Sequence, residues 1–251
     1  RDLVRSRGLG DVYKRQAKAL ILCNPSNPCG KVFTFEELTA IADVVKKYDA
    51  YVVTDEVYEH IVYAPNKHIY MQALDGMRER TIVCNSLSKT YSITGWRLGY
   101  VIANPEIIDR VKKVHDFLTV GAAAPLMEAA TVGLKFDDKY YDELAAHYAH
   151  MKEVFVGGLE KLGLKYTDPQ GAYYVLVDVS EFGVKDDVKF CEWLAQYVGV
   201  AAVPGSSFFR EDVNNLIRFH FAKQDDTLNE AINRLAGLRK AVAEAGDVEW
   251  R

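Results

Sequence analysis

The feature that most constrains the fold is a repeated order of short apolar runs and longer amphipathic segments. Four runs are apolar along nearly their whole length and are typical of buried strands: residues 19–23, 51–55, 81–85 and 98–102. Strands that are apolar on both faces are typical of a mostly parallel sheet covered by helices on each side. The sequence therefore predicts an α/β domain.

A helix is predicted between the first two runs. Thr34 and Glu37 form a capping box at its start, and apolar residues then follow at helical spacing: Leu38, Ile41, Ala42 and Val45. A capped helix between two strands fits the crossover connection that a parallel sheet requires.

The pattern changes after about residue 137. A long helix is predicted over 140–162, followed by three strands and two more helices: strands 172–177, 200–203 and 216–222, and helices 186–196 and 228–243. We therefore assign residues 17–137 to part of a large domain and 138–251 to a smaller α+β C-terminal domain. Residues 1–16 are basic and without periodicity, and they resemble translated adapter sequence from a contig end, so we expect a non-native leader.

Composition excludes several classes of function. A net charge of −4 gives no basic surface for nucleic acid, and no apolar run reaches the ~20 residues that span a membrane. The four cysteines lack Cys-x-x-Cys spacing, so we expect reduced thiols in a cytoplasmic protein. The six histidines do not cluster with acidic residues at metal spacing, and no metal is expected.

One lysine stands in an unusual place. The segment Asn-Ser-Leu-Ser-Lys-Thr puts Lys89 among hydroxyl residues at the end of an apolar run, and Gly-Trp-Arg-Leu-Gly follows at 95–99. An ammonium there is costly unless its amine is held as an imine to a carbonyl cofactor; the alternative is a surface lysine in a loop. The whole string resembles the cofactor-lysine segment of the class I/II aminotransferases, pyridoxal-phosphate enzymes related to aspartate aminotransferase.

The resemblance covers residues 17 to about 242 and implies the fold type I architecture and a homodimer with active sites at the subunit boundary. The family's N-terminal portion has no counterpart here, so no residue can be assigned to stack on the cofactor ring. We therefore expect this chain to be the larger, C-terminal part of an aminotransferase.

The resemblance also implies the residues that hold pyridoxal 5'-phosphate. Lys89 forms the Schiff base and then moves a proton at the substrate α-carbon. Asp55, in Asp-Glu-Val-Tyr, pairs with the pyridine nitrogen, and Tyr58 donates to the ring hydroxyl. Asn27, in Asn-Pro-Ser-Asn-Pro-Cys-Gly, contacts the ring hydroxyl and the substrate. The structural alternatives are a helix cap for Asp55, a core position for Tyr58 and turn formation for Asn27.

Two further groups bind anions. Ser86, Ser88 and Arg97 are expected to grip the cofactor phosphate, since hydroxyls and a guanidinium are good phosphate donors. Arg218, in an alternating run, is the residue that the resemblance assigns to the substrate α-carboxylate; an internal ion pair is the alternative.

The function expected is transfer of an amino group from an amino acid to a 2-oxo acid. Three alternatives remain open at this point: a pyridoxal-phosphate-dependent carbon–sulfur lyase of the same fold, a truncated fragment without activity, and an aminotransferase-like sensor domain.

Overall fold

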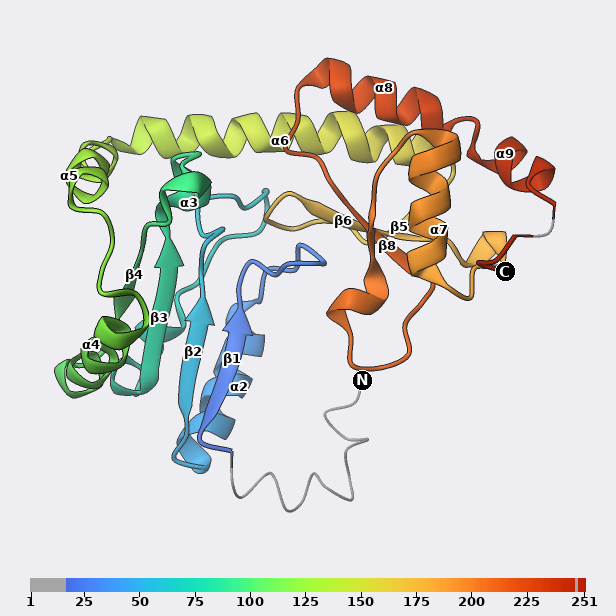
Figure 1. The fold of residues 1–251 in the computed structure, drawn as a ribbon. Helices are drawn as coiled ribbons and strands as arrows, with labels where there is room; N and C mark the ends of the chain where they lie inside the picture. The colour runs from blue at the N-terminus through green and yellow to red at the C-terminus, as the bar shows by residue number, and fades with distance from the viewer. Residues whose placement is uncertain (1–16, 247) are drawn as a thin grey trace. The chain divides into compact units, whose positions relative to one another are not determined.

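The computed structural model describes residues 17–246 and 248–251, and the expected leader at 1–16 lies outside the described residues. The chain divides into two compact units (Figure 1). Of the described residues, one unit contains 17–25, 32–59 and 67–137, and the other contains 26–31, 60–66, 138–246 and 248–251. Two short loops, 26–31 and 60–66, therefore belong to the C-terminal unit although they lie early in the sequence.

The N-terminal unit is built on a four-stranded sheet in the order β1-β2-β3-β4. β1 (Ala19–Cys23), β2 (Tyr51–Asp55) and β3 (Thr81–Ser86) are parallel, and β4 (Gly99–Ile102) runs antiparallel to β3. The prediction of a mostly parallel α/β sheet is confirmed.

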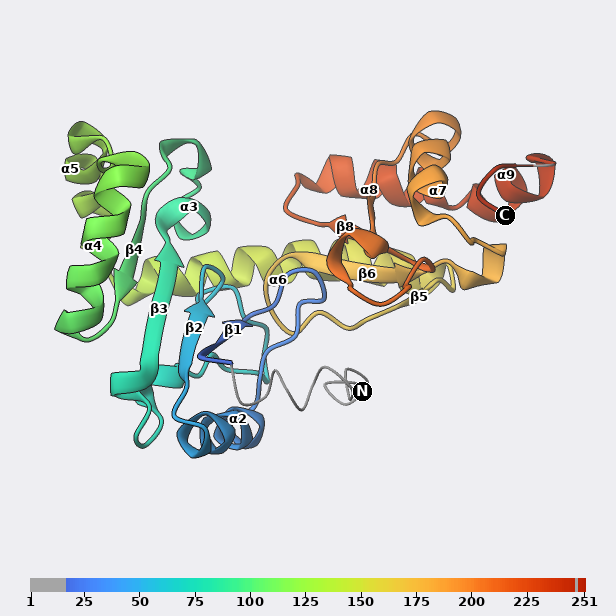
Figure 2. The same ribbon diagram turned by 60° about the horizontal axis from the view of Figure 1, so that its bottom comes forward.

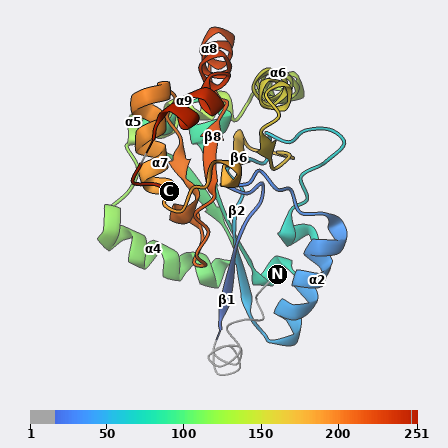
Figure 3. The ribbon, with the colours of Figure 1, turned by 90° about the vertical axis from the view of Figure 1, so that its right-hand side faces the viewer.

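Helix α2 (Phe35–Lys47) covers one face of this sheet. Its capping box is present, with Thr34 accepting from the Glu37 backbone and Glu37 accepting from the Thr34 backbone. The core beneath it consists of buried apolar side chains from α2, the strands and the following loop: Leu22, Leu38, Ala42, Val45, Val52, Met71 and Met77. Figure 3 shows α2 and α4 (Pro105–Thr119) on opposite sides of the sheet.

A second, smaller core lies beyond the end of β3. The short helix α3 (Leu87–Thr90) follows β3 directly, and α5 (Ala124–Gly133) packs beside it. Leu87, Leu98 and Ala130 are buried together there. This cluster fixes the direction in which the chain leaves β3.

The C-terminal unit has an antiparallel sheet in the order β5-β6-β8-β7. Its strands are short: β5 (Lys165–Tyr166), β6 (Tyr174–Asp178), β7 (Val203–Pro204) and β8 (Leu216–His220). The longer helical segments of this unit are α6 (Asp138–Lys161), α7 (Asp187–Trp193), which continues into a π-helical turn (Leu194–Val198), α8 (Asp225–Leu235) and α9 (Leu238–Glu244). The long α6 packs along α8, and in Figure 2 it runs behind β6.

Several element boundaries differ from the sequence prediction. The single helix predicted at 228–243 is two helices, α8 and α9, which meet at Gly237, a residue that disfavours helix continuation. The strand predicted at 200–203 is reduced to β7, and α4, α5 and β5 were not predicted. In the described ranges, no helix is long and apolar enough to cross a membrane.

Candidate active site

Asp55 is the last residue of β2 and lies in register with Cys23 on β1 and Cys84 on β3. Residues in register on parallel strands point to the same face of the sheet. The Asp55 side chain is exposed and accepts a 3.3 Å hydrogen bond from the Val57 backbone. The carboxyl end of a parallel strand is where ligands bind in open α/β sheets, so Asp55 is in a position to meet one.

The negative charge of Asp55 also affects its neighbour Cys84 on β3. Burial, and after it the negative charge of Asp55, raises the pKa of the Cys84 thiol. Cys84 therefore stays protonated near neutral pH and does not compete with Lys89 as a nucleophile.

The β3–α3 junction gathers hydroxyl groups around one backbone turn. The Ser86 hydroxyl caps α3 by accepting from the Ser88 backbone at 3.1 Å, and it lies 2.7 Å from the Ser88 hydroxyl. Lys89 follows within the same helix, half-buried, and no ion pair holds its amine within the described part of the chain. An amine without a counter-ion is available for a covalent partner.

Arg97 is tied to this junction through its neighbour Leu98. The Leu98 carbonyl accepts from the Leu87 backbone at 3.2 Å and lies 3.1 Å from the Ser86 hydroxyl. Arg97 itself is exposed, has a left-handed backbone (φ 56°), and donates through Nη1 to the Thr94 carbonyl at 3.0 Å. The guanidinium is therefore held at one nitrogen, on the Thr94 carbonyl.

The chain after β2 forms a buried polar network that the sequence analysis missed. Glu56 and His68 pair at 3.2 Å with side chains 2% and 6% exposed, and Glu59 lies within 4.8 Å of both. The prediction that no histidine clusters with acidic residues was wrong, because the loop to β3 returns His68 to β2. Glu59 accepts from Asn85 at 2.5 Å, so the network links the ends of β2 and β3. Tyr58 lies in the same turn and is buried.

Asn27 lies in the loop 26–31 of the C-terminal unit. The loop closes through a 2.8 Å hydrogen bond from the Gly30 backbone to Ser26, and the Gly30 carbonyl accepts from Gln170 and Gly171 at 2.9 and 2.8 Å. Gly30 has φ +68°, and a Cβ there would lie 2.8 Å from the Gly171 carbonyl oxygen, so only glycine fits. The loop is thereby fastened to the start of β6, with the Asn27 side chain exposed.

Arg218 on β8 meets Asn27 and two aromatic rings. Its Nη1 donates to Asn27 Oδ1 at 2.6 Å, and its Cζ lies 4.3 Å from the ring centroid of Tyr174 and 4.6 Å from that of Phe208. Its Nε is buried and has no hydrogen-bond partner among the described residues. The expected alternative, an internal ion pair, is absent for Arg218 in the described structure. An unsatisfied donor of this kind fits an anionic ligand.

The predicted site residues thus fall into two groups. The N-terminal unit carries the larger one at the carboxyl edge of its sheet: Asp55, Tyr58, Ser86, Ser88, Lys89 and Arg97. The C-terminal unit carries Asn27 and Arg218, joined to each other. Tyr174 and Phe208 were not predicted as site residues, although the segments that contain them resemble the family.

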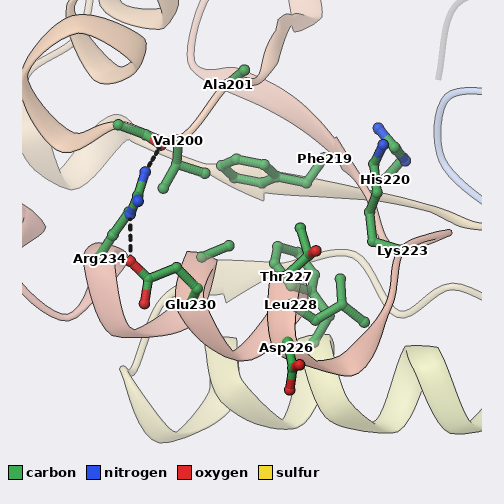
Figure 4. Close-up of a pocket in the computed structure, with 13 residues that line it drawn as sticks. Val200, Ala201, Phe219, His220, Lys223, Asp226, Thr227, Leu228, Glu230 and Arg234 are labelled. Atoms are coloured by element: carbon green, nitrogen blue, oxygen red, sulfur yellow. Dashed lines mark hydrogen bonds and ion pairs between the residues drawn. The ribbon is translucent and has the colours of Figure 1, made fainter.

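A separate cavity of about 620 Å³ lies in the C-terminal unit (Figure 4). It is lined by β8, α8 and the residues before β7, and none of the predicted site residues lines it. Arg234 crosses one end, donating to Glu230 at 2.8 Å and to the Gly199 carbonyl at 2.9 Å. The cavity therefore belongs to the packing of α8 on the sheet.

Comparison with known proteins agrees with this geometry. The family described as "Aminotransferase class I and II" matches residues 6–235. A probable N-succinyldiaminopimelate aminotransferase of Mycobacterium tuberculosis is 36% identical over 238 residues, covering 91% of this chain and 60% of the relative. The methionine aminotransferase of Escherichia coli is 35% identical over 228 residues, covering 90% of this chain and 59% of the relative.

Solved structures give the same result. The N-succinyldiaminopimelate aminotransferase structure from Mycobacterium tuberculosis superposes with a TM-score of 0.86 at 35% identity, covering 91% of this chain and 61% of that one. The chain therefore has the fold type I architecture of aspartate aminotransferase-like enzymes. It spans about 60% of the length of these relatives.

Proposed function

Because the chain belongs to the class I and II aminotransferase family, we propose that its parent protein transfers an amino group from an amino acid to a 2-oxo acid with pyridoxal 5'-phosphate. The observation that carries the proposal is Lys89, an amine without an ion-pair partner in the described residues, one short turn beyond β3 and beside the strand that ends in Asp55.

The residues present fit the cofactor. The Lys89 amine suits its aldehyde, the Asp55 carboxylate suits a protonated ring nitrogen, and Tyr58 suits its hydroxyl. Ser86 and Ser88 offer hydroxyl groups at the β3–α3 junction and Arg97 offers a guanidinium, which together are the donor types that a phosphate needs. When bound, the cofactor supplies an electron sink that makes the substrate α-hydrogen acidic.

The chain's own groups then perform the proton transfer and the positioning. The Lys89 amine would take the proton from the substrate α-carbon and hold it for return later in the transfer. Asp55 keeps the ring nitrogen protonated throughout. Arg218 pairs with the substrate α-carboxylate, and its partner Asn27 sets the orientation of its guanidinium and reaches the ring hydroxyl.

The proposal concerns the reaction type and leaves the amino acid open. Relatives of nearly equal identity are named for different amino acids, N-succinyldiaminopimelate in one case and methionine in another. Identity of about 36% therefore does not select among substrates.

Half-reaction spectroscopy of the parent protein, with a panel of amino acids, tests the proposal. The visible absorbance of the bound cofactor is expected to disappear on addition of the right amino acid and to return only when a 2-oxo acid is added. Release of a 2-oxo acid and ammonia without a second substrate would instead identify a lyase. Lys89→Ala is expected to abolish the visible band, while Lys67→Ala, at an exposed loop position, retains it.

We further propose that the protein works as a cytoplasmic homodimer. Large apolar side chains near the end of α4 support a partner surface: Phe117 is 93% exposed and Leu118 74%. The four cysteines form no disulfide in the described residues, as expected in a reducing compartment. Sedimentation at increasing protein concentration tests for the dimer. Phe117→Asp is expected to shift the protein to monomer, and Lys112→Asp, on the same helix, is the control. Cell fractionation tests the location.

A further inference from the structure

A buried carboxylate stands behind the turn that contacts Arg218. Asp187, the first residue of α7, is 2% exposed. Its Oδ2 accepts from the Ser206 backbone at 2.7 Å, and its Oδ1 accepts from the Ser206 hydroxyl at 2.8 Å. Both carboxylate oxygens of Asp187 therefore accept hydrogen bonds from one residue, which lies 19 positions away in the sequence.

This arrangement needs a reason, because a buried carboxylate is costly unless it is well bonded. Hydrogen bonds to a charged acceptor are stronger than those between neutral groups, so the two bonds from Ser206 offset much of that cost. A neutral side chain would hold α7 in place without the cost. The carboxylate is thus better explained by its hydrogen bonds to Ser206, which hold the following turn in place, than by a contribution to the stability of α7.

Ser206 lies in the 3₁₀ turn Gly205–Phe208, and Phe208 is the residue of that turn that contacts the Arg218 guanidinium. At the other end of the turn, Gly205 lies so close to the Leu216 backbone of β8 that a Cβ could not be accommodated. The turn is therefore held on one side by β8, the strand that carries Arg218, and on the other by Asp187.

We propose that Asp187 is a positioning residue for Arg218, acting through Ser206 and Phe208. By fixing the turn it keeps the Phe208 ring over the guanidinium, while Tyr174 on β6 supplies the other ring. The assignment of a substrate carboxylate as the ligand of Arg218 rests on the proposed function; the positioning does not.

The nitrogens of Arg218 that the protein does not already bond determine where a ligand can bind. Nη1 is committed to Asn27, and the two rings occupy space over the guanidinium plane. Nε is buried and has no partner within the described residues. A carboxylate that meets the edge formed by Nε and Nη2 would pair its two oxygens with two donors in one plane and would give the buried Nε its missing partner.

The ring contacts can be measured directly by NMR of the arginine side chain in the 251-residue chain. Aromatic rings over a guanidinium shift its Nε proton upfield, and Arg218→Lys assigns the signal. Asp187→Asn and Phe208→Leu are each expected to move the Arg218 Nε proton signal downfield. Ser206→Ala is expected to move the signal by less, and Phe208→Tyr, which retains an aromatic ring, is expected to leave it in place. Phe209→Leu, next in the same segment, is the matched control and leaves the signal unmoved.

Folding is checked by near-UV circular dichroism. If Asp187→Asn fails to fold, Ser206→Ala replaces it as the test of the positioning role, because this variant removes only the hydrogen bond of the Ser206 hydroxyl. An unmoved Arg218 signal in a folded Asp187→Asn or, failing that, in Ser206→Ala would overturn the proposal.

Titration with propionate separates this proposal from the proposed function. Asp187→Asn is expected to weaken propionate binding at the Arg218 signal about tenfold, with Phe209→Leu unchanged. If propionate does not bind the unaltered chain while the ring shift still depends on Asp187, the carboxylate role of Arg218 fails and the positioning role stands. Equal propionate affinity in both forms, with binding detected, would contradict the positioning role.

Discussion

Arg218 Nη1 donates a 2.6 Å hydrogen bond to Asn27 Oδ1, joining residues 191 positions apart in the sequence. The bond connects the loop 26–31, fastened through Gly30 to residues 170 and 171, with the strand β8. A loop expected to contact a cofactor ring and an arginine expected to hold a substrate carboxylate are thus parts of one arrangement.

Replacing Asn27 is expected to change carboxylate affinity in two distinguishable ways. Asn27→Ala frees Nη1 and loosens the guanidinium, and a lost hydrogen bond to a charged group corresponds to about 1.5–3 kcal/mol, or roughly tenfold to a hundredfold weaker binding. Asn27→Asp introduces a carboxylate that competes for Arg218 directly and weakens binding further. Calorimetric titration with propionate measures both.

Ser207→Ala, at an exposed position of the Gly205–Phe208 turn, is the control and should bind as the unaltered chain does. Equal affinity in Asn27→Asp and the unaltered chain would show that Asn27 does not govern Arg218.

Two neighbouring glycines of α6 test how α8 packs on it. A Cβ at Gly158 would lie 2.5 Å from Ile232 Cγ1 of α8, whereas a Cβ at Gly157 would meet nothing within 4 Å. Gly157→Ala is expected to stabilise by about 0.5–1 kcal/mol, since alanine favours a helix. Gly158→Ala is expected to destabilise by about 1–3 kcal/mol through overpacking. Urea unfolding of both variants gives the comparison, and equal free energies of unfolding would show that α8 moves freely over α6.

Two histidines are expected to give pH dependences of opposite sign. Burial, then the positive charges of Lys223 and Arg218, lowers the pKa of His220. The unfolded chain then binds the proton more readily, so stability is lost as pH falls below the unfolded value of about 6.5. His220→Gln removes this loss and should gain stability relative to the unaltered chain at pH 5 but not at pH 8.

The hydrogen bond that His150 Nε2 donates to Asp225 Oδ2, and after it the negative charge of Asp225, raise the pKa of His150. His150 thus contributes stability that is present below pH 6.5 and disappears as pH rises through the folded value. His150→Gln should lose stability at pH 5 and not at pH 8, and by little, because the pair is exposed. Unfolding in urea at the two pH values measures both variants; effects of the same sign would contradict the assignment.

Local patterns in the sequence were enough to predict the sheet of the N-terminal unit. Residues 19–23 and 51–55 were predicted as strands and are β1 and β2 at the same bounds, because short apolar runs bounded by turn residues favour strands. The prediction that 19–23 is buried was wrong: Ile21 is 77% exposed, because β1 is the edge strand of the described sheet. The capping box at Thr34 was equally local. The loops 26–31 and 60–66 could not be placed in this way, since their hydrogen bonds go to residues 170–172.

The surroundings of the predicted site residues depend on contacts that no local pattern contains. Arg218 lies in an alternating run and received its role from the resemblance to the family, but its contacts with Phe208 and Asn27 come from distant segments. Asp187 looks like an ordinary acidic residue at a helix start, and only its burial against Ser206 shows otherwise. The pair of Glu56 with His68 was missed for the same reason.

The most direct test of the account is to find which lysine of the chain takes pyridoxal 5'-phosphate. The 251-residue chain is incubated with the cofactor, reduced with borohydride, and its peptides are mapped by mass spectrometry. We predict that the label is on Lys89 and approaches one per chain, and that Asp55→Ala weakens labelling while Asp43→Ala, an exposed aspartate on α2, does not. Label spread over exposed lysines such as Lys67 and Lys112, with Lys89 unmodified, would contradict the account.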